Sequence, residues 1–173
     1  MVSRYILFFL LVITTGFGCR TIPEPLFEMR VEADLNIPAG LNSFDTHYFY
    51  IRDVPTRYQT FVSSDSQLDG IASIYPNRAI LSSIFTNIDW AILREISIHA
   101  ISQRNPQQRN EVFYFDRLDS NVKDLNLFSS LSEVKDILLQ DFITLEVRLN
   151  FNRVLPTEIE SRITMNFNVN GPE

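Results

Sequence analysis

The chain is poor in the residues that most often build reactive or metal-binding sites. Its 173 residues include one cysteine, Cys19, and two histidines, His47 and His99. A single cysteine cannot form an intrachain disulfide, and it excludes a zinc site made of several thiolates. The two histidines lie in separate segments with no cysteine near either. The sequence therefore predicts no metal site and no cofactor.

Sequence motifs of the common catalytic classes are absent as well. The chain contains no G-x-S-x-G elbow, no P-loop, no H-E-x-x-H motif and no S-x-x-K motif with its partner motifs. Glu158 and Glu160 are the one carboxylate pair of interest, because alternate residues of a strand lie about 7 Å apart on one face. That separation overlaps the one an inverting glycosidase needs, but Arg162 beside them favours a solvated face. We predict no catalytic residue and keep an envelope hydrolase, a glycosidase or peptidase with a site in the loops, as an alternative.

Positive charge is scarce relative to negative charge. Lys and Arg number 15 against 21 Asp and Glu, so the formal net charge is −6. An acidic chain is repelled by phosphate backbones and by anionic lipid surfaces. Nucleic acid is therefore excluded as an expected partner.

The longest apolar run lies at the start of the chain, in MVSRYILFFLLVITTGFGC. Arg4 and the terminal amine precede about nine apolar residues, and small residues follow them. That order is typical of a secretory signal peptide, and the run is shorter than the roughly 20 residues of a transmembrane helix. We therefore assign residues 1–18 to a signal peptide.

The stretch GFGC at residues 16–19 resembles the lipobox of bacterial lipoproteins. Gly18 is the small residue expected before the cysteine, whereas Gly16 stands where leucine is usual and Phe17 is bulkier than the common choice. The resemblance implies cleavage before Cys19, acylation of that residue and, with Arg20 rather than Asp after it, a place on the outer membrane of a diderm bacterium. Several acyl chains hold a protein firmly on a bilayer, since each buried methylene contributes about 0.8 kcal/mol. Ordinary signal cleavage with Cys19 as a spare thiol is the alternative.

After a short tether at residues 19–25, which contains Pro23 and Pro25, the chain reads as one domain over residues 26–173. Apolar and polar residues alternate strictly over 27–37, 143–151 and 159–169, apart from Ser161. Such alternation predicts strands with one buried and one solvated face. We expect 143–151 and 159–169 to form an antiparallel hairpin, with Glu146 and Arg148 opposite Glu160, Arg162 or Thr164.

Four further segments have strand character: 46–54, 78–85, 92–102 and 111–118. About seven strands separated by turn residues predict an all-β fold, an antiparallel β-sandwich that is immunoglobulin-like or similar. Ser130 and Glu133 have capping-box spacing, and the apolar residues after them follow a helical period, which predicts one short helix near 132–139.

Three tyrosines are the remaining residues that indicate a possible binding surface. Tyr48, Tyr50 and Tyr114 fall in strand segments at positions where some rings must face outward. Exposed tyrosines form flat amphipathic patches suited to sugars or protein partners, although aromatic pairing between strands would also explain them. We expect a membrane-anchored, non-catalytic binding or scaffold module whose partner is a protein or an envelope polymer. A structural or adhesin-type subunit is a further alternative.

Overall fold

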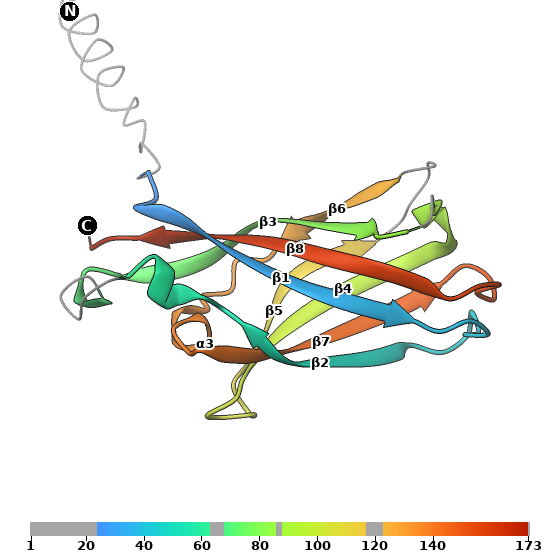
Figure 1. Ribbon diagram of the computed structural model, residues 1–173, viewed down its shortest axis with the longest axis horizontal. Helices are drawn as coiled ribbons and strands as arrows, with labels where there is room; N and C mark the ends of the chain where they lie inside the picture. The colour runs from blue at the N-terminus through green and yellow to red at the C-terminus, as the bar shows by residue number, and fades with distance from the viewer. Residues whose placement is uncertain (1–23, 63–67, 86–87, 117–122, 173) are drawn as a thin grey trace, which may run out of the picture.

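The computed structural model describes residues 24–62, 68–85, 88–116 and 123–172, which fold into antiparallel strands with very little helix (Figure 1). Eight strands lie within these ranges: β1 (Phe27–Ile37), β2 (His47–Pro55), β3 (Ser73–Ser83), β4 (Leu93–Ser102), β5 (Arg109–Asp116), β6 (Asp124–Ser129), β7 (Phe142–Phe151) and β8 (Ile159–Asn170). The 3-10 turns η1 (Tyr58–Thr60) and η2 (Trp90–Ile92) and the helix α3 (Lys135–Leu138) complete the described elements. The predicted all-β antiparallel fold is confirmed, with eight strands in place of about seven.

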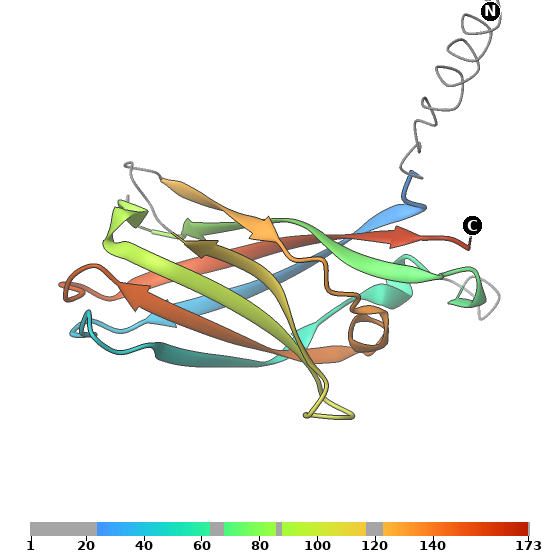
Figure 2. The ribbon, with the colours of Figure 1, turned by 180° about the vertical axis from the view of Figure 1, so that it is seen from behind.

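The strands follow the order β1-β8-β3-β6-β5-β4-β7-β2. Strands β1, β8, β3 and β6 form one layer, and β2, β7, β4 and β5 form the other. A short ladder between β5 and β6, in which Phe113 pairs with Ser129 and Tyr114 with Phe128, joins the layers along one edge. Figure 2 shows the two layers from behind. This order is that of a jelly roll and not that of an immunoglobulin-like sandwich.

The expected hairpin between the last two strands is wrong. Strand β7 pairs with β2 and β4, whereas β8 pairs with β1 and β3 in the facing layer. Both strands bury a full row of apolar side chains, and two such rows meet best when they face each other across a core about 10 Å thick. Accordingly Arg162 pairs with Asp34 on β1, and Glu146 pairs with Arg109 and Arg148.

The core lies between the layers, as the alternating pattern predicts. Phe113 of β5 and Phe167 of β8, both fully buried, meet edge to face with ring centroids 5.5 Å apart. Ser161, the break in the pattern of β8, is also buried, and its hydroxyl donates to the carbonyl oxygen of Leu35 at 2.9 Å. Because that hydrogen bond satisfies the hydroxyl, the polar residue is tolerated inside the sandwich.

The predicted helix is present but short. It covers Lys135–Leu138 within the expected 132–139 and packs Ile137 and Leu138 into the core. The Glu133 carboxylate accepts hydrogen bonds from the backbone N–H groups of Lys135, at 2.7 Å, and Ile74, at 3.2 Å. Glu133 thereby fastens α3 to β3 at the end of the sandwich that also holds the C-terminus (Figure 1).

Signal peptide, Cys19 and most of the tether fall in residues 1–23, outside the described ranges. Their assignments therefore stay predictions. Among the described residues, no helix has the length and apolar character needed to cross a bilayer.

Candidate functional site

The outer face of the layer β2–β7–β4–β5 brings the three candidate tyrosines together. Tyr48 pairs with Arg148, Arg148 with Ser97 and Ser97 with Tyr114, so these residues form one row across the four strands. The ring of Phe128 continues the row onto β6, with its centroid 5.9 Å from that of Tyr114. Tyr48, Tyr50 and Tyr114 are 53%, 56% and 39% exposed, so all three present ring surface to solvent.

A buried carboxylate occupies the centre of the same face. In the neighbouring row, Tyr50 pairs with Glu146, and Glu146 with His99. The Glu146 side chain is 2% exposed, and its Oε1 atom lies 2.5 Å from Nη2 of Arg109 and 2.7 Å from Nε of Arg148. Two guanidinium groups therefore compensate a charge that would be costly to bury alone.

The charged groups also orient two of the tyrosines around this centre. The guanidinium carbon of Arg148 lies 5.4 Å from the centroid of the Tyr48 ring, which is cation–π geometry. A hydrogen bond from the Tyr50 hydroxyl to the Glu146 carboxylate raises the pKa of Tyr50. The Tyr50 hydroxyl thus stays a donor, because the carboxylate beside it disfavours a second negative charge.

His99 lies on this face but is half buried. Its Nδ1 atom is buried and has no hydrogen-bond partner among the described residues. Burial lowers the pKa of His99, the positive charge of Arg109 lowers it further, and Glu146 partly opposes both. His99 is therefore neutral at pH 7 and adds no charge to the site.

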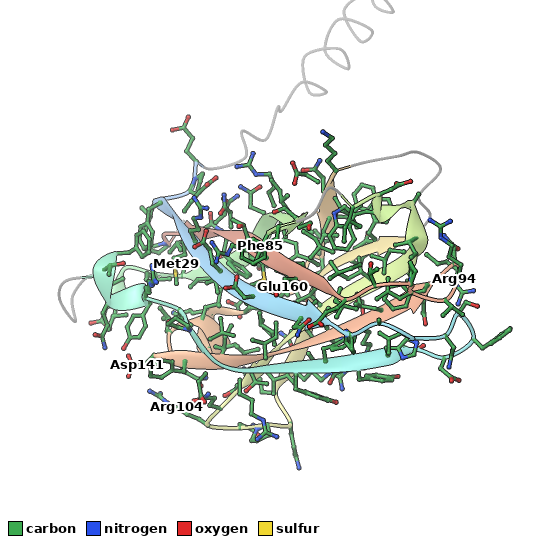
Figure 3. All side chains as sticks on the ribbon, turned by 45° about the vertical axis from the view of Figure 1, so that its right-hand side comes forward. Met29, Phe85, Arg94, Arg104, Asp141 and Glu160 are labelled. Atoms are coloured by element: carbon green, nitrogen blue, oxygen red, sulfur yellow. The ribbon has the colours of Figure 1, made fainter. Side chains whose placement is uncertain are left out.

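A groove of about 630 Å³ opens beside Glu146, and its lining includes Tyr50, Asp53, Gln103, Arg109 and Thr144. One wall is a bulge in β2, where Asp53 has a φ of 54° and the pairing with β7 shifts between Ile51 and Val54. The other wall is the loop between β4 and β5, which projects from the layer with Arg104 on it (Figure 3). Nε2 of Gln103 donates to Oδ1 of Asp53 at 2.8 Å and joins the two walls.

The opposite face has a different character. Over β1, β8 and β3 it carries exposed ion pairs, Arg30 with Glu32 and Arg162 with Asp34. Among the described residues of these three strands, Tyr75 is the one large aromatic side chain that is strongly exposed. The two faces of the sandwich are therefore unlike, and the exposed aromatic side chains of the strands gather mainly on the face of β2–β7–β4–β5.

Other residues singled out from the sequence lie elsewhere. Nε2 of His47 is 2.9 Å from the carbonyl oxygen of Asn42, and its ring packs against Phe151 rather than near His99. Glu158 and Glu160 are both exposed, and Glu158 accepts a hydrogen bond from Asn36 at 2.6 Å. Within the described ranges no group of three or more His, Cys, Asp or Glu residues could hold a metal ion.

Comparison with known proteins gives a likeness of fold at low similarity. No family model matches the chain, and no curated protein does. Similar solved structures include Desmodium yellow mottle tymovirus (TM-score 0.27, 10% identity, covering 91% of this chain and 98% of that chain) and the empty head of turnip yellow mosaic virus (TM-score 0.32, 8% identity, 91% and 89%). A third is nora virus (TM-score 0.32, 11% identity, 88% and 65%). At these scores the likeness assigns the chain neither a family nor a function.

Proposed function

We propose that the protein is a lipid-anchored, non-catalytic binding module of a bacterial cell envelope, which holds its partner on the outer face of β2–β7–β4–β5. The observation that carries the proposal is the gathering of Tyr48, Tyr50 and Tyr114 around the buried Glu146 on that one face. Tyrosine provides large, rigid, amphipathic contact surface at a low cost in conformational entropy.

A binding role fits the chemistry of the groove better than a hydrolytic one. Glu146 is held by two guanidinium groups and by the Tyr50 hydroxyl, so its contacts orient neighbouring side chains. A general base must instead lie within hydrogen-bond distance of a substrate proton or of a water molecule. Glu158 and Glu160, the pair considered for hydrolysis, lie on the solvated surface and line none of the grooves described here.

The proposed anchor is compatible with access to this face. Strand β1 begins near the end of the sandwich where β8 ends, while the β1–β2 and β7–β8 loops lie at the far end (Figures 1 and 2). The outer face of β2–β7–β4–β5 runs along the side of the molecule between these ends. A tether that leaves the end where β1 begins would hold the membrane at that end, so the membrane would not cover the outer face of β2–β7–β4–β5.

A site-specific photo-cross-linker tests the proposed surface in cells. A benzophenone amino acid placed at Tyr48 should trap the partner of the full chain on irradiation. The same group at Tyr75, an exposed tyrosine of the other layer, is the matched control and should trap nothing specific. Equal labelling from both positions, or none from Tyr48, would reject the surface.

The anchor has a separate test. Replacing Cys19 with serine removes the thiol that the lipobox resemblance assigns to acylation. The variant should lose its acyl chains in mass analysis and leave the membrane fraction. A variant that stays with the membranes, processed as before, would contradict the proposed tether.

A further inference from the structure

We infer that the partner on this face is an uncharged carbohydrate chain, lying across the strands with its sugar rings against the tyrosines and its hydroxyl groups in the groove. The inference rests on the proposed function and specifies its ligand. Three features carry it: the balance of charge in the groove, the position of polar groups relative to aromatic rings, and the length of the aromatic row.

Charge in the groove is balanced within the protein. The charged residues that line it are two arginines, Arg52 and Arg109, and two carboxylates, Asp53 and Glu146, while Arg148 contacts Glu146 from outside the lining. Arg109 is paired with Glu146, and Asp53 accepts from Gln103. A charged ligand would need an excess of opposite charge, which the lining does not offer. A polyhydroxyl ligand needs instead a dense set of fixed donors and acceptors, and carboxylate, guanidinium and amide groups provide these.

The arrangement of polar and aromatic groups is the reverse of a typical protein interface. Such interfaces have an apolar, fully buried core surrounded by a polar rim. Here the buried Glu146 and the half-buried His99 occupy the middle of the face. The rings stand at its margins, Tyr48 and Tyr50 on the edge strand β2 and Tyr114 with Phe128 at the junction of β5 and β6. A protein partner would have to cover this charged centre with apolar surface, whereas a sugar chain would bond with its hydroxyls to the accessible polar groups beside it, such as Arg109 and Gln103.

The length of the row favours a chain over a single sugar. Tyr48 and Tyr114 are separated by two strands, so about three strand spacings, or roughly 14 Å, lie between them. Arg148 fixes the Tyr48 ring by stacking on it. Rings packed against Arg148 at one end of the row and against Phe128 at the other suit an extended ligand that contacts both of them.

Affinity electrophoresis of the detergent-purified full chain provides the test. Native gels would contain soluble β-glucan, xylan, galactomannan or starch, and the polyanion alginate would serve as the charged probe. At least one neutral polysaccharide should retard the protein, and 0.5 M NaCl should leave that retardation unchanged. Absence of retardation by all four, or retardation by alginate alone, would overturn the inference.

Substitutions on this face test whether the retardation arises from binding there. Tyr48→Ala and Tyr50→Ala should each weaken binding about tenfold, whereas Tyr48→Phe should retain it because the ring is kept. Tyr75→Ala on the other layer is the control and should bind as the unaltered chain does. If an alanine variant fails to fold by near-UV circular dichroism, Gln103→Ala in the exposed loop is used, and it should weaken binding severalfold. Retardation that survives Tyr48→Ala, Tyr50→Ala or Gln103→Ala in a folded protein would place the ligand elsewhere.

The two experiments separate this inference from the function on which it rests. If the cross-linker at Tyr48 traps a protein while no neutral polysaccharide retards the chain, the surface is correct and the ligand class is wrong. If neither experiment gives a signal, the binding surface itself is rejected.

Discussion

Arg109 of β5 reaches across β4 to Glu146 of β7, with Nη2 of the arginine 2.5 Å from Oε1 of the carboxylate. The contact spans two strand spacings and passes beside His99, which pairs in register with Glu146. Arg148 approaches the same oxygen atom from within β7. One buried charge therefore links β5 to β7 and fixes the side chains on which the proposed binding surface depends.

Replacing Glu146 with alanine should destabilise the fold markedly. The substitution leaves two partly buried guanidinium groups without a counter-charge, and breaking a buried pair in this way costs about 3 kcal/mol. Because the two arginine side chains are 31% and 34% exposed, we expect a loss of about 2–3 kcal/mol. Urea unfolding followed by the fluorescence of the buried Trp90 would measure it.

The matched control is Glu32→Ala. Glu32 lies the same 2.5 Å from its partner Arg30, but its side chain is 39% exposed. An exposed pair contributes less than about 1 kcal/mol, so this variant should unfold close to the unaltered protein. Equal losses in the two variants would show that burial does not decide the strength of the Glu146 contacts.

Acid should weaken the fold through His99. Burial and Arg109 lower its pKa in the folded state, so the unfolded chain binds the proton more readily. The stabilising effect of a neutral His99 is complete above its ordinary pKa of about 6.5 and is lost as the pH falls through the lowered folded value. Unfolding free energies between pH 7.5 and 5 should therefore fall less steeply for His99→Gln than for the unaltered chain. Parallel curves would remove His99 as a cause of acid sensitivity.

The strands with strict alternation could be predicted, because a period of two residues is explained by a strand with one buried and one solvated face. In β1 from Met29 onward, and throughout β8, every second residue is buried, and Ser161 shows that a hydroxyl with a partner can take such a place. Strand β6 is not among the predicted strands, since it is six residues long and buries only Leu125 and Leu127. The first half of β3 also lies outside the predicted segment, because Pro76 normally ends a strand and is accommodated here next to a register shift.

The sequence does not show which layer each strand joins, nor does it show that a charged group, Glu146, is buried on the outer face. Alternation shows which face of β7 is buried but not which strand lies beside it, so a short loop suggested a hairpin where the chain in fact crosses between layers. Outward residues of β7 were expected to be solvated, yet Glu146 is buried by its neighbours on β2 and β4. Arg109 belongs to the polar stretch SQRNPQQRN at 102–110, which reads as a loop, whereas in the structure β5 begins at Arg109. Contacts between residues distant in sequence create this site, and a local pattern does not encode them.

Contact between the layers can be tested with Phe113 and Phe167. These fully buried rings come from opposite layers and meet edge to face. Phe167→Ala should cost about 3–5 kcal/mol, because it removes a large apolar side chain and leaves a cavity. A double-mutant cycle with Phe113→Ala should give a coupling of about 0.5–1.5 kcal/mol. Phe142→Ala, at a ring that is 47% exposed, should cost less than about 1 kcal/mol, and a larger effect there would contradict the described core.

Arg57→Gly should stabilise the protein. Arg57 has a φ of 55°, in the left-handed region that costs a residue with a side chain roughly 1 kcal/mol relative to glycine, and its side chain is exposed. Removing that strain should outweigh the greater flexibility of glycine in the unfolded chain, for a net gain of up to about 0.5 kcal/mol. Arg52→Gly, at an exposed position within β2 where φ is not positive, should instead lose about 0.5–1 kcal/mol. Urea unfolding of the two variants side by side would decide, since a loss of stability in both would show that the conformation at Arg57 is not strained.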